Sequence, residues 1–291
     1  MFFLRWLHYQ AYSAFVVTTV LSKALVLWFE CLFLPTRYFS YNRRKPKHAP
    51  VFIVGCGHSG TSLLLALVGT HSSFCAVPGE SNLAYDYDNR RVRVGSLRSA
   101  LLLRYFDLLT ISRRRQRWVE KTPKHVYSIP ELRRLVPGCR FLVILRDGRD
   151  VACSIEARYG NLEKGIERWV DDNRAAEPFW HDADVHVMKY EDLIVNLRGT
   201  METVFAFLGE KFEEGVLRSH EKPKYYYSRK IQKPPDQSQK YHDQYRNWQI
   251  NQELFDGRGK WHELPPEARA MIKRHAGRML IDYGYATDEN W

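Results

Sequence analysis

A glycine-rich turn near residue 55 carries the residues best suited to bind an anion. The segment reads Val51-Phe-Ile-Val-Gly-Cys-Gly-His-Ser-Gly-Thr-Ser62 and leads into a further apolar run. A buried strand, a tight turn and a helix N-terminus in this order gather backbone N–H groups around a phosphate, and hydroxyl side chains add donors. The spacing Gly55-x-x-x-x-Gly60 matches a Walker A loop, but Thr61 stands where a nucleotide triphosphatase carries lysine. The segment predicts a phosphate site for a nucleotide-like ligand, with an ordinary strand-to-helix turn as the alternative.

A second segment, Arg146-Asp-Gly-Arg-Asp-Val-Ala-Cys-Ser154, directly follows the apolar run at residues 141–145. Arg146 and Ser154 have the chemistry to bind one phosphate, through a planar bidentate contact and a neutral donor. An ordinary turn in which Arg146 pairs with Asp150 explains the same residues equally well.

A third segment, Glu120-Lys121-Thr122-Pro123, follows a short apolar stretch. A lysine at the end of a strand can stabilise negative charge that develops on a transferred group. A solvated surface lysine is the alternative interpretation of Lys121.

The elements that must position these segments alternate between strand and helix. We expect strands at 51–55, 117–120, 140–145 and 185–189, and helices at 61–69, 93–112, 129–136, 150–159, 162–180, 200–208 and 268–283. This alternation predicts an α/β, P-loop-like three-layer fold with a central parallel sheet flanked by helices. In such sheets ligands bind beyond the carboxyl ends of the strands, where the first two segments fall. Residues 222–247 are rich in Pro, Gln, Tyr and Lys and predict a long loop or lid.

Length and composition favour one domain, residues 50–291, after an N-terminal appendage, residues 1–49. A chain of 291 residues with 45% hydrophobic content can bury one sizeable core. The net charge of +11 favours a polyanionic partner, which is a phosphorylated cofactor, an acidic membrane surface or nucleic acid. The five cysteines have no zinc or disulfide spacing, and we expect no metal site.

The appendage combines an apolar stretch, residues 11–34, with a basic run at residues 37–47. An apolar helix here could span a membrane, lie in its interface or pack on the core. Membrane association is the prediction, with the basic run and the catalytic part on the cytoplasmic face. A signal-anchored protein in the Golgi lumen is the alternative. The absence of an Asn-x-Ser/Thr acceptor and the odd number of cysteines favour a reducing setting.

Together the three segments resemble the superfamily of sulfotransferases that use 3′-phosphoadenosine 5′-phosphosulfate (PAPS). The resemblance covers about residues 50–210, with a weaker tail. Residues 57–62 are similar to the family's 5′-phosphosulfate loop, and Arg146 with Ser154 to its 3′-phosphate motif. Residues 257–261 are loosely similar to a late loop that closes on the 3′-phosphate. The resemblance implies that PAPS is bound by Gly57, His58, Ser59, Gly60, Thr61, Ser62, Arg146, Ser154, Arg258 and Lys260.

The chain departs from the family pattern at two positions. Most members carry Lys or Arg where His58 stands, so His58 is expected to donate a hydrogen bond or to shape the loop. The cytosolic small-molecule members carry a base histidine where this chain has Pro123. The carbohydrate and tyrosyl-protein members use a Gly-Glu pair after the phosphate loop, and Gly79-Glu80 occupies a similar place. The closer resemblance is therefore to the second type, with Glu80 as general base.

The resemblance implies an enzyme that moves a sulfuryl group from PAPS to an acceptor hydroxyl by in-line transfer. Glu80, Lys121 and His58 are the expected catalytic residues, carbohydrate is the expected acceptor class, and no metal is needed. One alternative is an atypical P-loop phosphotransferase, which the absence of a lysine after Gly60 disfavours. The other is a non-catalytic membrane-tethered nucleotide or nucleic-acid binder, which the aromatic and basic residues 222–229 would suit. We expect no nucleic acid as partner.

Overall fold

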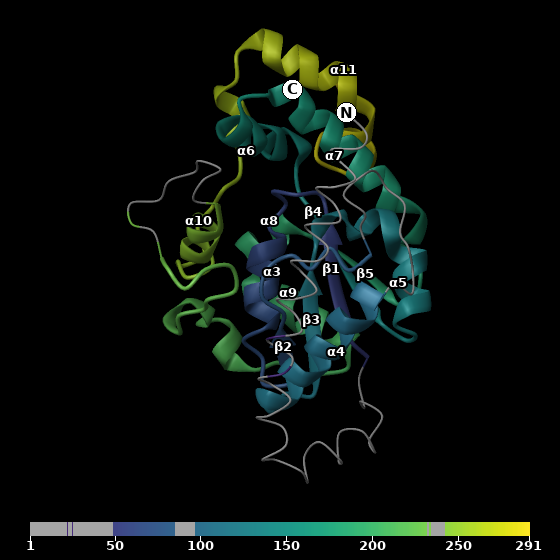
Figure 1. Ribbon diagram of the computed structural model, residues 1–291. Coiled ribbons are helices and arrows are strands. Elements are labelled where there is room, and N and C mark those ends of the chain that lie inside the picture. The colour runs from purple at the N-terminus through teal and green to yellow at the C-terminus, as the bar shows by residue number, and fades with distance from the viewer. Residues whose placement is uncertain (1–21, 23–24, 26–48, 85–96, 232, 234–241) are drawn as a thin grey trace, which may run out of the picture.

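The computed structural model describes residues 22, 25, 49–84, 97–231, 233 and 242–291 (Figure 1). A five-stranded parallel sheet forms the centre, in the order β2-β3-β1-β4-β5. The strands are β1 (Val51–Gly55), β2 (Phe74–Ala76), β3 (Arg117–Lys121), β4 (Arg140–Leu145) and β5 (Val185–Lys189). The predicted α/β fold with a central parallel sheet is confirmed.

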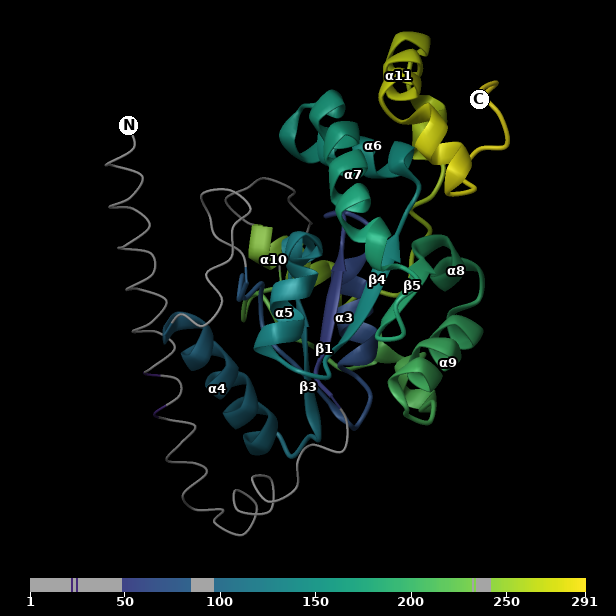
Figure 2. The same ribbon diagram turned by 90° about the vertical axis from the view of Figure 1, so that its right-hand side faces the viewer.

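Side chains of β1 alternate between the two faces of the sheet and so divide the core into two layers. Phe52 and Val54 pack into one cluster, while Val51 and Ile53 pack into the other. The first cluster is covered by α4 (Leu97–Ser112) and α5 (Ile129–Leu135). The second is covered by α3 (Thr61–Val68) and α9 (Leu197–Leu208). Figure 2 shows α4 and α5 on one side of the sheet and α9 on the other.

A third apolar cluster lies beyond the carboxyl ends of the strands. It joins α6 (Gly148–Tyr159), α7 (Leu162–Ala176) and α11 (Pro266–Asp282), which stand together at the top of Figure 1. Because β1 pairs with both β3 and β4, the ends of these three strands come to one edge of the sheet. The glycine-rich turn, Lys121 and Arg146 all begin at that edge.

Some elements differ from the predicted ones. The strand β2 and the helix α8 (Tyr190–Val195) were not predicted, and Pro123–Ser128 forms a 3-10 helix. The predicted helix at 162–180 ends at Ala176, because a 3-10 turn at Glu177–Phe179 replaces its last part. The predicted loop at 222–247 contains the start of a helix, α10 (His242–Gln249).

The predicted N-terminal apolar helix lies outside the described residues, apart from residues 22 and 25. Within the described ranges, none of the helices has the length and apolar character needed to cross a bilayer.

Candidate active site

The glycine-rich turn has the backbone of an anion-binding loop. Gly60 precedes α3 with a φ of 96°, in the left-handed region, and His58 has a φ of 71°. A Cβ atom on Gly60 would lie 2.8 Å from the ring of Tyr190, so both the backbone conformation and the space require glycine. The loop is therefore closely packed and runs directly into the N-terminus of α3. The first N–H groups of a helix are available there to bind an anion.

Contacts between the loop and Arg146 join the two predicted phosphate motifs. Nδ1 of His58 lies 2.9 Å from Oγ of Ser154. The guanidinium of Arg146 donates to the carbonyl oxygen of His58 at 3.0 Å and to that of Gly257 at 2.6 Å. Three segments that are distant in the sequence thus meet at one place, and His58, Gly60, Arg146 and Ser154 line the same pocket.

Two buried polar atoms at this place are left without a hydrogen-bond partner among the described residues. They are Oγ of Ser59, whose residue is fully buried, and Nε of Arg146. Buried donors are normally satisfied, so the unpaired Nε of Arg146, which lines the pocket, is suited to an acceptor that a ligand supplies. A phosphate-bearing ligand supplies such acceptors, and the residues of the predicted site fit it.

Lys121 and Glu80 form an ion pair in which Nζ lies 2.5 Å from Oε1. Lys121 is almost fully buried, whereas 43% of the Glu80 side chain is exposed. Burial by itself would raise the pKa of Glu80, but the charge and hydrogen bond of Lys121 outweigh it and the pKa is lowered. Burial would likewise lower the pKa of Lys121, but the nearby Tyr227 and Glu80 outweigh it and the pKa is raised. At neutral pH both groups are therefore charged, and Glu80 is an accessible carboxylate.

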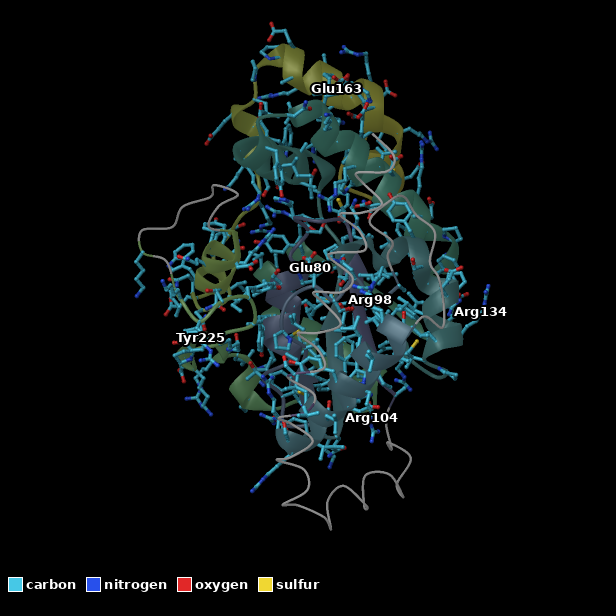
Figure 3. The ribbon with its side chains drawn as sticks, viewed as in Figure 1. Glu80, Arg98, Arg104, Arg134, Glu163 and Tyr225 are labelled. Atoms are coloured by element: carbon cyan, nitrogen blue, oxygen red, sulfur yellow. The ribbon has the colours of Figure 1, made fainter. Side chains whose placement is uncertain are left out.

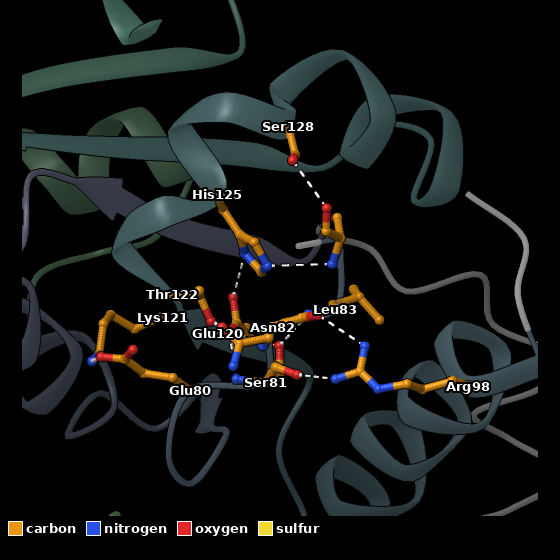
Figure 4. A network of polar contacts seen from close by, with 11 residues as sticks. Glu80, Ser81, Asn82, Leu83, Arg98, Glu120, Lys121, Thr122, His125 and Ser128 are labelled. Atoms are coloured by element: carbon orange, nitrogen blue, oxygen red, sulfur yellow. Dashed lines mark hydrogen bonds and ion pairs between the residues drawn. The ribbon is translucent and has the colours of Figure 1, made fainter. Parts of the chain in front are cut away.

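Glu120, the neighbour of Lys121 on β3, holds the turn that carries Glu80 (Figure 4). The buried carboxylate accepts hydrogen bonds from N and Oγ of Ser81, at 3.2 and 2.7 Å, and from Oγ1 of Thr122 at 2.5 Å. Nδ1 of His125 lies 3.1 Å from its other oxygen, within ion-pair distance. Burial would raise the pKa of Glu120, but His125 and the hydroxyl donors lower it. Glu120 is thus an ionised, fully buried anchor for residue 81.

The guanidinium of Arg98 closes the same network from α4. It donates to the backbone oxygens of Asn82 at 3.0 Å and Ser81 at 3.1 Å. With Glu120 on one side and Arg98 on the other, the backbone beside Glu80 is fixed by charged hydrogen bonds, which are the stronger kind. Sequence reasoning could not find these contacts, because the partners of Glu120 and Arg98 lie far away in the chain.

Tyr227 is another contact that the sequence did not predict. Its hydroxyl donates to Oγ of Ser62 at 3.0 Å, and Nζ of Lys121 lies 5.1 Å from the centre of its ring. The aromatic and basic stretch at residues 222–229 therefore contributes to the wall of the site.

The late glycine loop lies against α6. Asp150 accepts from the backbone N of Gly259 at 2.9 Å, and the carbonyl of Gly257 meets Arg146. Arg258 forms an ion pair with Asp256, and both Arg258 and Lys260 are exposed. The loop is therefore beside the pocket, while nucleotide binding by Arg258 and Lys260 stays a prediction.

A family model for the sulfotransferases matches residues 50–214, more than half of the chain. The chain belongs to the sulfotransferase family. The match confirms the resemblance drawn from the three segments, and with it the enzyme class, a sulfotransferase with PAPS as co-substrate. It favours sulfuryl transfer over the phosphotransferase and nucleic-acid-binding alternatives. None of the curated proteins compared with the chain matches it.

Solved structures similar to this sulfotransferase include three proteins of low sequence identity. The sulfotransferase domain from the curacin biosynthetic pathway has a TM-score of 0.55 and 16% identity, with 80% of this chain and 97% of that chain covered. The sulfotransferase domain from the Synechococcus PCC 7002 olefin synthase also has a TM-score of 0.55 and 16% identity, with 81% and 97% covered. Mouse sulfotransferase SULT7A1 complexed with PAP has a TM-score of 0.52 and 15% identity, with 81% and 89% covered. These likenesses support the fold.

Within the described part of the chain, one group of side chains has metal-ligand spacing: Glu163, Glu167 and His275. It lies on α7 and α11, and its two carboxylates are exposed. Figure 3 shows Glu163 near the end of the molecule formed by these helices, whereas Glu80 lies at its centre. This group is not part of the candidate active site.

Proposed function

We propose that this sulfotransferase transfers a sulfuryl group from PAPS to an acceptor hydroxyl with Glu80 as the general base. The ion pair between Glu80 and Lys121, which Tyr227 connects to Ser62 of the loop, is the observation that supports it. When bound, PAPS supplies the activated sulfur and a stable leaving group, 3′,5′-adenosine bisphosphate (PAP). The acceptor oxygen forms a bond to sulfur as the bond between sulfur and the bridging oxygen breaks.

Glu80 accepts the proton of the attacking hydroxyl. Its carboxylate is ionised and partly exposed, and both properties are required of a base that must reach a substrate. Lys121 holds Glu80 in place and offers its positive charge to the negative charge that develops during transfer. Because Lys121 is buried, its charge acts through little water.

The phosphate groups are held by the residues that the sequence singled out. Backbone N–H groups of residues 57–62 and the hydroxyls of Ser59, Thr61 and Ser62 face the 5′ side. Arg146 and Ser154 hold the 3′-phosphate, and His58 links the two halves through its hydrogen bond to Ser154. This arrangement positions the sulfur for in-line attack.

Carbohydrate or a glycoconjugate is the acceptor class that we propose. The support is the resemblance: Gly79-Glu80 occupies a place similar to that of the Gly-Glu pair in the carbohydrate-type members.

Transfer of label from radiolabelled PAPS to panels of glycan, lipid and peptide acceptors tests the proposal. We expect transfer to a glycan by the wild type. This transfer should be lost in Glu80→Gln and in Lys121→Ala, and kept in the control Glu221→Gln, which changes an exposed residue. Equal transfer by the wild type and both site variants would contradict the assigned roles. Transfer to lipid or peptide alone would replace the acceptor class.

Membrane association through residues 1–49 is a separate proposal, supported by the apolar stretch and the basic run that follows it. Flotation of the full chain with vesicles that contain an anionic lipid tests it. We expect binding that weakens when Arg43 and Arg44 are both replaced by Glu, and unaltered flotation would contradict the role of the basic run.

A further inference from the structure

Arg246, on α10, is a cation of the pocket wall that belongs to none of the three sequence motifs. His58, Gly60 and Ser62 line the pocket from the phosphate loop, and Arg246, Ile250 and Phe255 line it from the segment that includes α10. Hydrogen bonds and the burial of an apolar side chain hold this segment in place. Asn251 exchanges hydrogen bonds with the backbone of Lys224, and Ile250 is buried. Arg246 is thus held on the wall of the pocket that the α10 segment forms.

The guanidinium of Arg246 has donors to offer. Among the described residues, its hydrogen bond is from Nη1 to the side-chain oxygen of Gln249, at 3.1 Å on the same helix, and no carboxylate forms an ion pair with it. A guanidinium carries five N–H donors. Two other cations of the site are engaged, because Lys121 is paired with Glu80 and Arg146 donates to two backbone carbonyls.

Arg246 lines the pocket opposite the phosphate loop, which is the geometric observation that carries the argument. Its charge also reaches the ion pair, since it adds to the effect of Lys121 in lowering the pKa of Glu80 and opposes the rise in the pKa of Lys121. A bound sulfuryl group must occupy this region, because it joins the 5′-phosphate to the attacking oxygen.

We propose that Arg246 contacts the sulfuryl oxygens of bound PAPS and stabilises them during transfer, an inference that rests on the proposed function. The loop supplies no lysine or arginine at position 58, and Nδ1 of His58 is hydrogen-bonded to Ser154. The bond from sulfur to the bridging oxygen breaks, the bond to the acceptor oxygen forms, and the hydroxyl proton goes to Glu80. Arg246 faces the sulfuryl oxygens throughout and is a catalytic residue.

Binding of PAPS and of PAP, measured by calorimetry, isolates this contact, since PAP lacks the sulfuryl group and no acceptor is needed. In Arg246→Gln we expect PAPS affinity to fall by about tenfold or more, the effect of losing one charge-assisted hydrogen bond. PAP affinity should stay within about twofold of the wild type. Arg246→Lys keeps the charge and should recover part of the loss. Arg229→Gln, an exposed position on the preceding segment, is the matched control.

Each other outcome overturns the inference in a recognisable way. An equal loss for both nucleotides would place Arg246 on a phosphate, and no loss for either would remove it from the nucleotide site. A raised KM for the acceptor with unchanged PAPS affinity would assign it to the acceptor. If the wild type bound neither nucleotide, the proposed function itself would fail.

Discussion

Replacement of Glu120 by Gln tests whether the buried network holds the turn that carries Glu80, the proposed base. Gln has nearly the same shape but lacks the charge, and one of its two polar ends is a donor. If its oxygen stays with Ser81 and Thr122, its NH2 group faces Nδ1 of His125. Nδ1 can accept only if the proton moves to Nε2, which already accepts from the backbone N of Ala84. If the amide is reversed, NH2 faces the N–H of Ser81 instead.

Every arrangement therefore leaves one buried donor unsatisfied. Such a donor costs about 1–3 kcal/mol, and hydrogen bonds to a charged group are stronger than those to a neutral one. The free energy of unfolding should fall by about 3 kcal/mol, because both effects apply to a fully buried site. For a domain of this size that corresponds to a drop in melting temperature of about 6–12 °C.

Thermal unfolding of Glu120→Gln measures this loss, with the exposed Glu156→Gln on α6 as the matched control. The control should change the stability by about 0.5 kcal/mol or less. The difference between wild type and variant should also depend on pH. The pKa of Glu120 is lowered in the folded protein, so its contribution is present above the ordinary value of 4.5 and is lost as the pH falls through the folded value. Equal melting temperatures for the two variants at neutral pH would refute this account of the network.

Three further predictions concern the site itself. The acid limb of the pH profile of kcat/KM for PAPS should lie below pH 4.5, because Glu80 has a lowered pKa and must be ionised to act. An inflection near pH 6.5 that persists in Glu80→Gln would indicate a histidine instead. Arg146→Ala should weaken PAP binding by at least about tenfold in calorimetry, whereas the exposed Arg174→Ala should not. Gly60→Ala should destabilise the protein by about 1–3 kcal/mol in denaturant unfolding, since its φ is 96° and its Cβ would meet Tyr190; unchanged stability would show that the loop relaxes freely.

Most strands could be predicted from the sequence, but strand β2 and helix α10 could not. Strands β1, β4 and β5 have the predicted bounds. In β1 and β4 a continuous apolar run between turn residues leaves little choice, whereas β5 is poorer in apolar residues and only partly buried. Strand β2 has three residues and no pattern long enough to detect. The start of α10 was assigned to a loop because His242–Gln249 is polar and aromatic, with few apolar side chains to show a helical period.

The candidate site was predictable where a motif is local and hidden where it depends on tertiary contacts. Gly60 and Arg146 could be singled out because each follows an apolar strand with a recognisable spacing. Arg246 and Tyr227 could not be found, since only folding brings the segment after residue 222 to the phosphate loop. Whether a lysine is paired or solvated is likewise invisible in sequence, and the structure shows Lys121 buried against Glu80.

The carboxylates of Glu80 and Glu120 lie close together in the fold but differ in their surroundings. Consecutive residues of β3 hold consecutive residues of the turn, Lys121 binding Glu80 and Glu120 binding Ser81. Glu120 is inaccessible and its oxygens are surrounded by donors, so it cannot reach a substrate proton. Glu80 has one charged partner and an exposed side, so an acceptor can approach it. Both are ionised at neutral pH, so access to a substrate, rather than charge, distinguishes Glu80, the proposed base, from Glu120.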